Sequence, residues 1–144
     1  MTRALPTLLL LTLSAPAGAA GVDVASLYEI VTDGTSGQLK AAEAGTLVIQ
    51  FKLKNGAHVS DEAPLKLELS SPGLALSRDK LTLADSANPK KPGEKSFPEP
   101  RFVVPFTPKA PGSTSVEAKM TFFICTEKLC ARQQKSLSIP VEVM

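Results

Sequence analysis

Residues 115–143 read SVEAKMTFFICTEKLCARQQKSLSIPVEV, and two alternating patterns in this stretch decide the fold. Before the first cysteine, apolar side chains occupy every second position, namely Val116, Ala118, Met120, Phe122 and Ile124. After the second cysteine the same spacing recurs at Leu137, Ile139, Val141 and Val143. A period of two is typical of a strand with one buried face. The stretch therefore predicts two long strands, residues 115–125 and 134–143, joined as a hairpin.

Shorter alternating segments precede this hairpin. The clearest are TLVIQFKLK (46–54), PLKLELS (64–70) and RFVVPF (101–106). Residues 74–76 and 81–83 are briefer strand candidates, and VDVASLYEIV (22–31) is either a strand or a helical turn. Because proline cannot donate a ladder hydrogen bond, Pro105 suggests an edge strand or a bulge. Together these segments predict an all-β fold, an immunoglobulin-like antiparallel β-sandwich of about seven to eight strands.

Turn signals separate the predicted strands. The chain has twelve prolines and nine glycines, a density that argues against a helical bundle. Asn55-Gly56 follows one alternating segment directly and favours a tight turn. Residues 85–100, DSANPKKPGEKSFPEP, form a lysine- and proline-rich loop within the domain.

The first twenty residues, MTRALPTLLLLTLSAPAGAA, resemble a secretory leader. Arg3 gives a positive start, residues 8–13 are mostly leucine, and small residues follow at 17–19, as signal peptidase requires. We expect residues 1–20 to be cleaved and residues 21–144 to form one exported domain, periplasmic or secreted. The apolar run is too short for a stable transmembrane helix, so no membrane insertion is expected after cleavage.

The charge balance excludes some partners. Removing Arg3 with the leader leaves 15 basic residues against 14 acidic ones, a formal charge of +1. Nucleic acids and anionic membranes are therefore not expected as partners. The mature chain is long enough to bury one core without needing a disulfide.

The two cysteines, Cys125 and Cys130, flank the loop TEKL at the centre of the predicted hairpin. Both fall on the polar face by strand parity, and residues directly opposite in such a hairpin lie about 4.5–5.5 Å apart, which suits a disulfide. That register places Gln133 and Lys135 on the core side. Either the hairpin tip projects beyond the sandwich or a bulge resets the phase.

Two interpretations of this cysteine pair remain open. In exported proteins an even number of cysteines usually indicates an inert structural disulfide. However, closing so short a loop stabilises a fold by only about 2 kcal/mol. The pair is also expected to be exposed, and the positive charges of Lys128 and Arg132 would favour a thiolate. These features favour a redox-active pair.

The segment from Phe102 to Val143 resembles the N-terminal periplasmic domain of the DsbD thiol-disulfide reductase family. The resemblance rests on RFVVPF, Pro111-Gly112, the long strand ending in an aromatic pair and Cys125, then Cys130 and LSIPVEV. Upstream, NGAHV (55–59) resembles the family's Asp-Gly-Tyr-x-Leu turn, and Phe97-Pro98 the region before its central strand.

The resemblance implies an immunoglobulin-like fold in which Cys125 and Cys130 cycle between dithiol and disulfide. It also implies electron exchange with thioredoxin-like or other exported thiol-disulfide proteins, and it suggests Phe97 as the aromatic cap of the pair. The chain departs from the family in reading Ala131-Arg132-Gln133, where prolines are usual, and in lacking a membrane segment and a thioredoxin domain. The electron donor and acceptor therefore stay open, and the alternative function is a non-enzymatic cell-envelope binding or structural module.

Other chemistry is sparse. The only histidine, His58, is expected to be an exposed polar residue. A Cu(I) site built from His58, Met120 and the thiols is an alternative, because soft sulfur ligands suit Cu(I), but Met120 has core parity. No phosphate-binding glycine loop, CxxC motif or carboxylate pair is present, so neither a cofactor nor a metal is expected.

Overall fold

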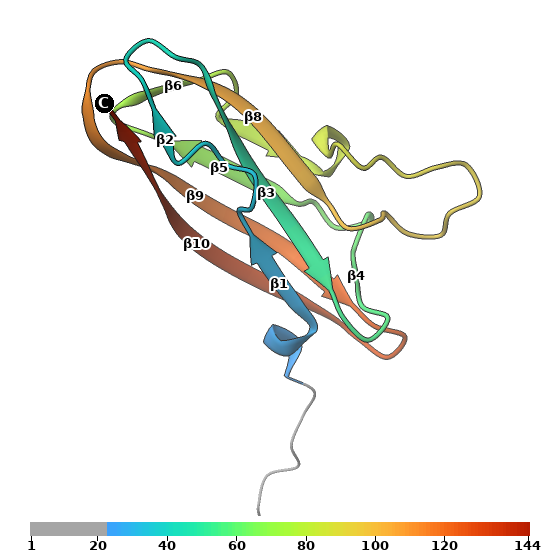
Figure 1. Cartoon of the computed structure of the whole chain (residues 1–144). Coiled ribbons are helices and arrows are strands. Elements are labelled where there is room, and N and C mark those ends of the chain that lie inside the picture. Colours follow the sequence, from blue (N-terminus) through green and yellow to red (C-terminus); the bar gives the residue numbers. More distant parts are fainter. Residues whose placement is uncertain (1–22) are drawn as a thin grey trace, which may run out of the picture.

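The computed structural model describes residues 23–144, and the predicted leader, residues 1–20, lies outside this range. The described residues form ten strands and two short 3-10 helices, η1 (Val24–Leu27) and η2 (Leu83–Asp85) (Figure 1). The strands are β1 (Tyr28–Val31), β2 (Gln38–Leu39), β3 (Gly45–Leu53), β4 (His58–Val59), β5 (Lys66–Ser70), β6 (Leu74–Leu76), β7 (Lys80–Thr82), β8 (Arg101–Pro108), β9 (Gly112–Cys125) and β10 (Cys130–Val143).

The strands form two sheets, which confirms the predicted all-β sandwich. One sheet has the order β1-β3-β8-β6, and the other has the order β2-β10-β9-β5-β7, with β4 also paired to β9. All neighbouring strands are antiparallel except β2 and β10. The strand count exceeds the expected seven to eight partly because β2 and β4 have two residues each, too few to show a period in the sequence.

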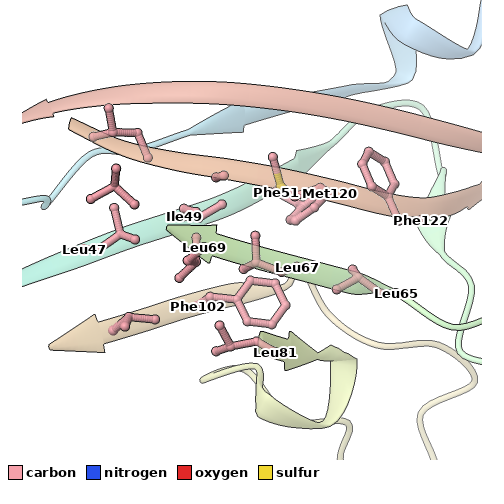
Figure 2. Packing of buried hydrophobic residues seen from close by; sticks show 14 of the residues in the cluster. Leu47, Ile49, Phe51, Leu65, Leu67, Leu69, Leu81, Phe102, Met120 and Phe122 are labelled. Atoms are coloured by element: carbon pink, nitrogen blue, oxygen red, sulfur yellow. The ribbon is translucent and has the colours of Figure 1, made fainter. Parts of the chain in front are cut away.

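The core lies between the sheets and consists mostly of the alternating side chains predicted from the sequence. Figure 2 shows Phe51, Met120 and Phe122 within this layer. The ring of Phe122 packs edge-on against Phe51 and Tyr28, with centroid distances of 4.9 and 5.2 Å. Aromatic rings prefer this edge-to-face geometry, in which the positive edge of one meets the negative face of another. One continuous cluster therefore unites both sheets.

The β9–β10 hairpin is regular along its whole length. Its register runs without interruption from Cys125 opposite Cys130 to Gly112 opposite Val143, so the suggested bulge is absent from this hairpin. Gln133 and Lys135 do face inward, and Tyr28 of β1 accommodates both. The Tyr28 hydroxyl donates a hydrogen bond to Gln133 Oε1 (3.1 Å), and Lys135 Nζ lies 5.8 Å from the centre of its ring.

Asn55 and Gly56 form the expected tight turn, with φ of 54° and 74° and a hydrogen bond from Ala57 N to Lys54 O. The ambiguous N-terminal segment contains both alternatives, a helical turn followed by a strand.

The edge position suggested by Pro105 is wrong, because β8 lies between β3 and β6. Pro105 pairs with Thr46 on the β3 side, and its carbonyl accepts a hydrogen bond from Ser77 on the other side. The N and C=O groups of a strand residue point to the same side, so the nitrogen of Pro105 also faces Ser77. Ser77 lies one residue beyond Leu76, the last residue of β6. An interior strand tolerates proline here because the neighbouring strand has ended.

Candidate functional site

The candidate site is the disulfide at the tip of the β9–β10 hairpin. Cys125 and Cys130 are bonded, with an S–S distance of 2.06 Å and Cα atoms 4.0 Å apart, as their predicted opposition requires. The four-residue turn between them is closed by a hydrogen bond from Thr126 N to Leu129 O (2.7 Å). Figure 1 shows this tip at the same end of the sandwich as β4, far from the C-terminus.

The hydrogen-bond pattern determines which groups of the two cysteines point at each other. Because Thr126 and Leu129 form a bonded pair, the next pair along, Cys125 and Cys130, is a non-hydrogen-bonded pair. Their backbone N–H and C=O groups therefore point away from each other, and their side chains are brought close. The ladder thus places the two sulfur atoms together independently of the bond between them.

The two cysteines differ sharply in exposure. Cys130 is exposed, as predicted, but Cys125 is only 3% exposed. The prediction of an exposed pair was therefore wrong for Cys125. It has the outward parity expected from the sequence, but the short strand β4 pairs alongside it and Cys130 flanks it on the other side.

The structure adds His58 to the site. His58 pairs directly with Cys125 across the β4–β9 ladder. Directly opposite residues share a face and have Cβ atoms about 4.5–5.5 Å apart, so His58, Cys125 and Cys130 form one row across three strands. A two-residue strand has no detectable period, so strand parity could not place His58 in this row.

Lys128 and Arg132 lie on either side of Cys130 along the chain. Lys128 is exposed in the hairpin turn, and Arg132 is exposed two residues beyond Cys130, on the same face of β10. Between them Leu129 is an exposed apolar residue, 38% accessible. Two cations and one apolar side chain therefore flank the exposed cysteine along the chain.

Phe97, the predicted cap, lies in the loop between η2 and β8. Its half-buried ring packs against the core, and Lys90 Nζ lies 5.9 Å from the ring centre. Lys90 in turn forms an ion pair with Asp61 (2.8 Å), three residues after His58. The hydrogen bond from Lys90 lowers the pKa of Asp61, and nearby His58 contributes to the same shift.

The alternative copper site is not formed. Met120 is buried in the core, on the opposite face of β9 from Cys125, and so cannot join His58. Within residues 23–144 no group of three or more His, Cys, Asp or Glu side chains is arranged to hold a metal ion. The same residues contain no helix long and apolar enough to span a membrane.

No protein-family model matches the chain, and neither does any curated protein sequence.

Proposed function

We propose that this protein is an exported thiol-disulfide exchange domain that acts through Cys125 and Cys130. The observation that carries the proposal is the pairing of one exposed and one buried cysteine in a single cross-strand position. Exchange needs an accessible sulfur that meets the partner and a second sulfur near enough to resolve the mixed disulfide. Cys130 has the first property, and Cys125 has the second.

The oxidative half of the cycle begins at Cys130. Its thiolate attacks one sulfur of a partner's disulfide, forming a Cys130–partner bond, and the other partner sulfur leaves as a thiolate that takes up a proton. The Cys125 thiolate then attacks the sulfur of Cys130, which closes the intramolecular disulfide and releases the second partner thiol. A thioredoxin-like reductant reverses these steps by attacking the exposed sulfur of Cys130.

His58 is the proton carrier in this scheme. Burial disfavours the charged thiolate of Cys125, so the step in which this sulfur attacks requires a nearby base. Imidazole exchanges protons between pH 5 and 8, and His58 occupies the position next to Cys125 in the row. It accepts the Cys125 proton when the disulfide closes and returns it when the disulfide opens.

The proposed partners are thioredoxin-like or other exported thiol-disulfide proteins. Support comes from the resemblance of residues 102–143 to the N-terminal domain of the DsbD family, from the sandwich fold and from the position of the cysteines near the end of a hairpin. Under this proposal the chain belongs to that family, and export follows from the predicted leader.

A redox titration tests the proposed function. The protein is equilibrated with glutathione or thioredoxin buffers, and the fraction of disulfide is measured by mass after thiol alkylation. We expect a reduction potential above about −300 mV, within the range of exchange proteins. A potential far below that value would show that the disulfide stays closed under cellular conditions and would overturn the relay.

The second candidate is a binding or structural module with an inert disulfide. The burial of Cys125 favours it, since inaccessible disulfides resist exchange. The two candidates differ in how the folded protein reacts. A relay opens its disulfide with a thioredoxin-like reductant while folded, whereas an inert disulfide opens only when the protein unfolds.

Replacing His58 with glutamine should slow the closure of the disulfide by about 10²-fold at neutral pH, because glutamine cannot carry the proton. Closure is measured by stopped flow, starting from a mixed disulfide between Cys130 and a small thiol, across pH 5 to 8. The rate should also lose much of its pH dependence.

Lys128→Gln is the matched control. It removes a positive charge from the same hairpin tip but leaves the imidazole in place, so its pH profile should keep the wild-type shape. If His58→Gln and the wild type show the same rates at every pH, His58 has no part in proton transfer.

A further inference from the structure

The outer edge of β10 is largely open. Its inner side pairs with β9 over the whole strand, but β2 pairs with it only at Glu142 and Val143. Within residues 23–144, no strand lies beside β10 from Cys130 to Val141 on this side. An open edge offers unpaired backbone N–H and C=O groups to an extended segment.

The register identifies the groups that point outward. Along β10, residues whose backbone groups form hydrogen bonds with β9 alternate with residues whose backbone groups point away from β9. The hydrogen bond from Glu142 N to Gly37 O shows that the even-numbered residues are those that point away from β9. Arg132, Gln134, Ser136 and Ser138 therefore present both their N–H and C=O groups to the open side. Gln133 Nε2 donates a hydrogen bond to Arg132 O (2.9 Å), which leaves that carbonyl a second lone pair. Pro140, which has no N–H, ends the run of donors.

We propose that this edge, from Cys130 to Ser138, binds an extended acidic segment of the redox partner as an added antiparallel strand. The partner residue opposite Cys130 is its reactive cysteine, and in this last step the inference rests on the proposed function. Paired residues on adjacent strands lie close enough for a disulfide, so strand addition aligns the two sulfur atoms before exchange.

Charge favours an acidic partner over a second copy of this chain. Residues 128–138 contain Lys128, Arg132 and Lys135 and no acidic residue. Two such edges would bring six positive charges together, whereas acidic side chains on the outer face of an added strand would lie beside Arg132. In an antiparallel register, the partner residue two positions before its cysteine lies opposite Arg132, and an acidic side chain there would share the face of that guanidinium.

On the face of β10 that points toward the other sheet, an added strand can place apolar side chains. A hollow of about 180 Å³ lies between β1 and β10, and its lining combines the apolar side chains of Ala25, Tyr28, Ile30 and Leu137 with Glu29 and Lys135. Side chains of an added strand alternate between the two faces. The proposed segment therefore alternates acidic residues on the outer face with apolar residues facing this hollow.

The test uses a nine-residue peptide that alternates valine and glutamate, with serine in place of the reactive cysteine. It is titrated into the oxidised, ¹⁵N-labelled protein, so that no thiol chemistry is involved and a failure of the proposed redox function would leave the result unaffected. We expect amide shifts at Arg132, Gln134 and Ser136. Absence of these shifts would overturn the proposal.

Two methylated peptides of equal composition identify strand addition. N-methyl groups four and six residues before the serine block amides that face β10, whereas methyl groups three and five residues before it lie on amides that face away. The first peptide should bind about tenfold or more weakly than the unmodified one, and the second should bind nearly as well. Equal affinities would show that the edge does not pair with the peptide.

Charge reversal separates the acidic partner from a second copy. Arg132→Glu should weaken binding of the glutamate peptide and strengthen binding of a peptide in which lysine replaces each glutamate. If the same amides shift with protein concentration alone and sedimentation shows a dimer, the edge is occupied by a second copy and the proposal is wrong.

Discussion

The Cys125→Ala variant is expected to capture disulfide partners at Cys130 at least about tenfold faster than the Cys130→Ala variant captures them at Cys125, because the buried thiol reacts only when the hairpin opens locally. Cys130 is exposed beside Lys128 and Arg132, whereas Cys125 is 3% exposed. Removing Cys125 also removes the sulfur that would release the partner, so the mixed disulfide should persist. Capture is measured with a thioredoxin-like protein carrying an intact disulfide, followed by non-reducing electrophoresis.

Two measurements make this comparison sound. Both variants should have the same free energy of unfolding within error, and both thiols should react at the same rate in denaturant, where burial is lost. Equal capture by the folded variants would show that the exposure difference does not govern exchange. Faster capture at Cys125 would reverse the assigned roles.

Phe122→Ala should lower the free energy of unfolding by about 3–5 kcal/mol, the usual loss when a fully buried aromatic side chain is truncated. Phe122 is completely buried, and its ring contacts both Phe51 and Tyr28 edge-on. The cavity would lie where β1, β3 and β9 meet, so both sheets lose packing. Urea unfolding of the oxidised protein measures the change.

Phe123→Ala is the matched control, since it removes the same atoms from the next residue on the opposite face. Phe123 is only half-buried, and its truncation leaves the inter-sheet layer intact. We expect a much smaller loss of stability. Losses of similar size for the two variants would contradict the assignment of Phe122 to the core.

The alternating patterns predicted most of the core correctly. Period two placed Leu47, Ile49 and Phe51 inside, and the same rule held for the alternating side chains of β8 and β9. The rule works because each of these strands buries one face against the opposite sheet, so that local sequence reports directly on burial. The cysteine register was predictable for the same reason, since a four-residue turn leaves few ways to align the flanking strands.

The burial of Cys125 and its pairing with His58 were not predictable. Both depend on β4, whose pairing with β9 joins residues more than sixty positions apart and involves two residues of the short strand. The same limit applies to Gln133 and Lys135, whose inward position looked unfavourable until Tyr28 was placed beside them. Strand parity describes the face on which a side chain lies, but only the three-dimensional neighbours decide whether that face is covered.

The five-residue separation of the cysteines also has a consequence for the order of folding. A hairpin closed by so short a turn forms within about microseconds, well before strands distant in sequence can meet. Leu47 and Val104, by contrast, pair across more than fifty intervening residues. Cys125 and Cys130 can therefore be oxidised in a newly synthesised chain whose core has not yet assembled, and the closed hairpin then offers β4 and β5 a preformed edge on which to add.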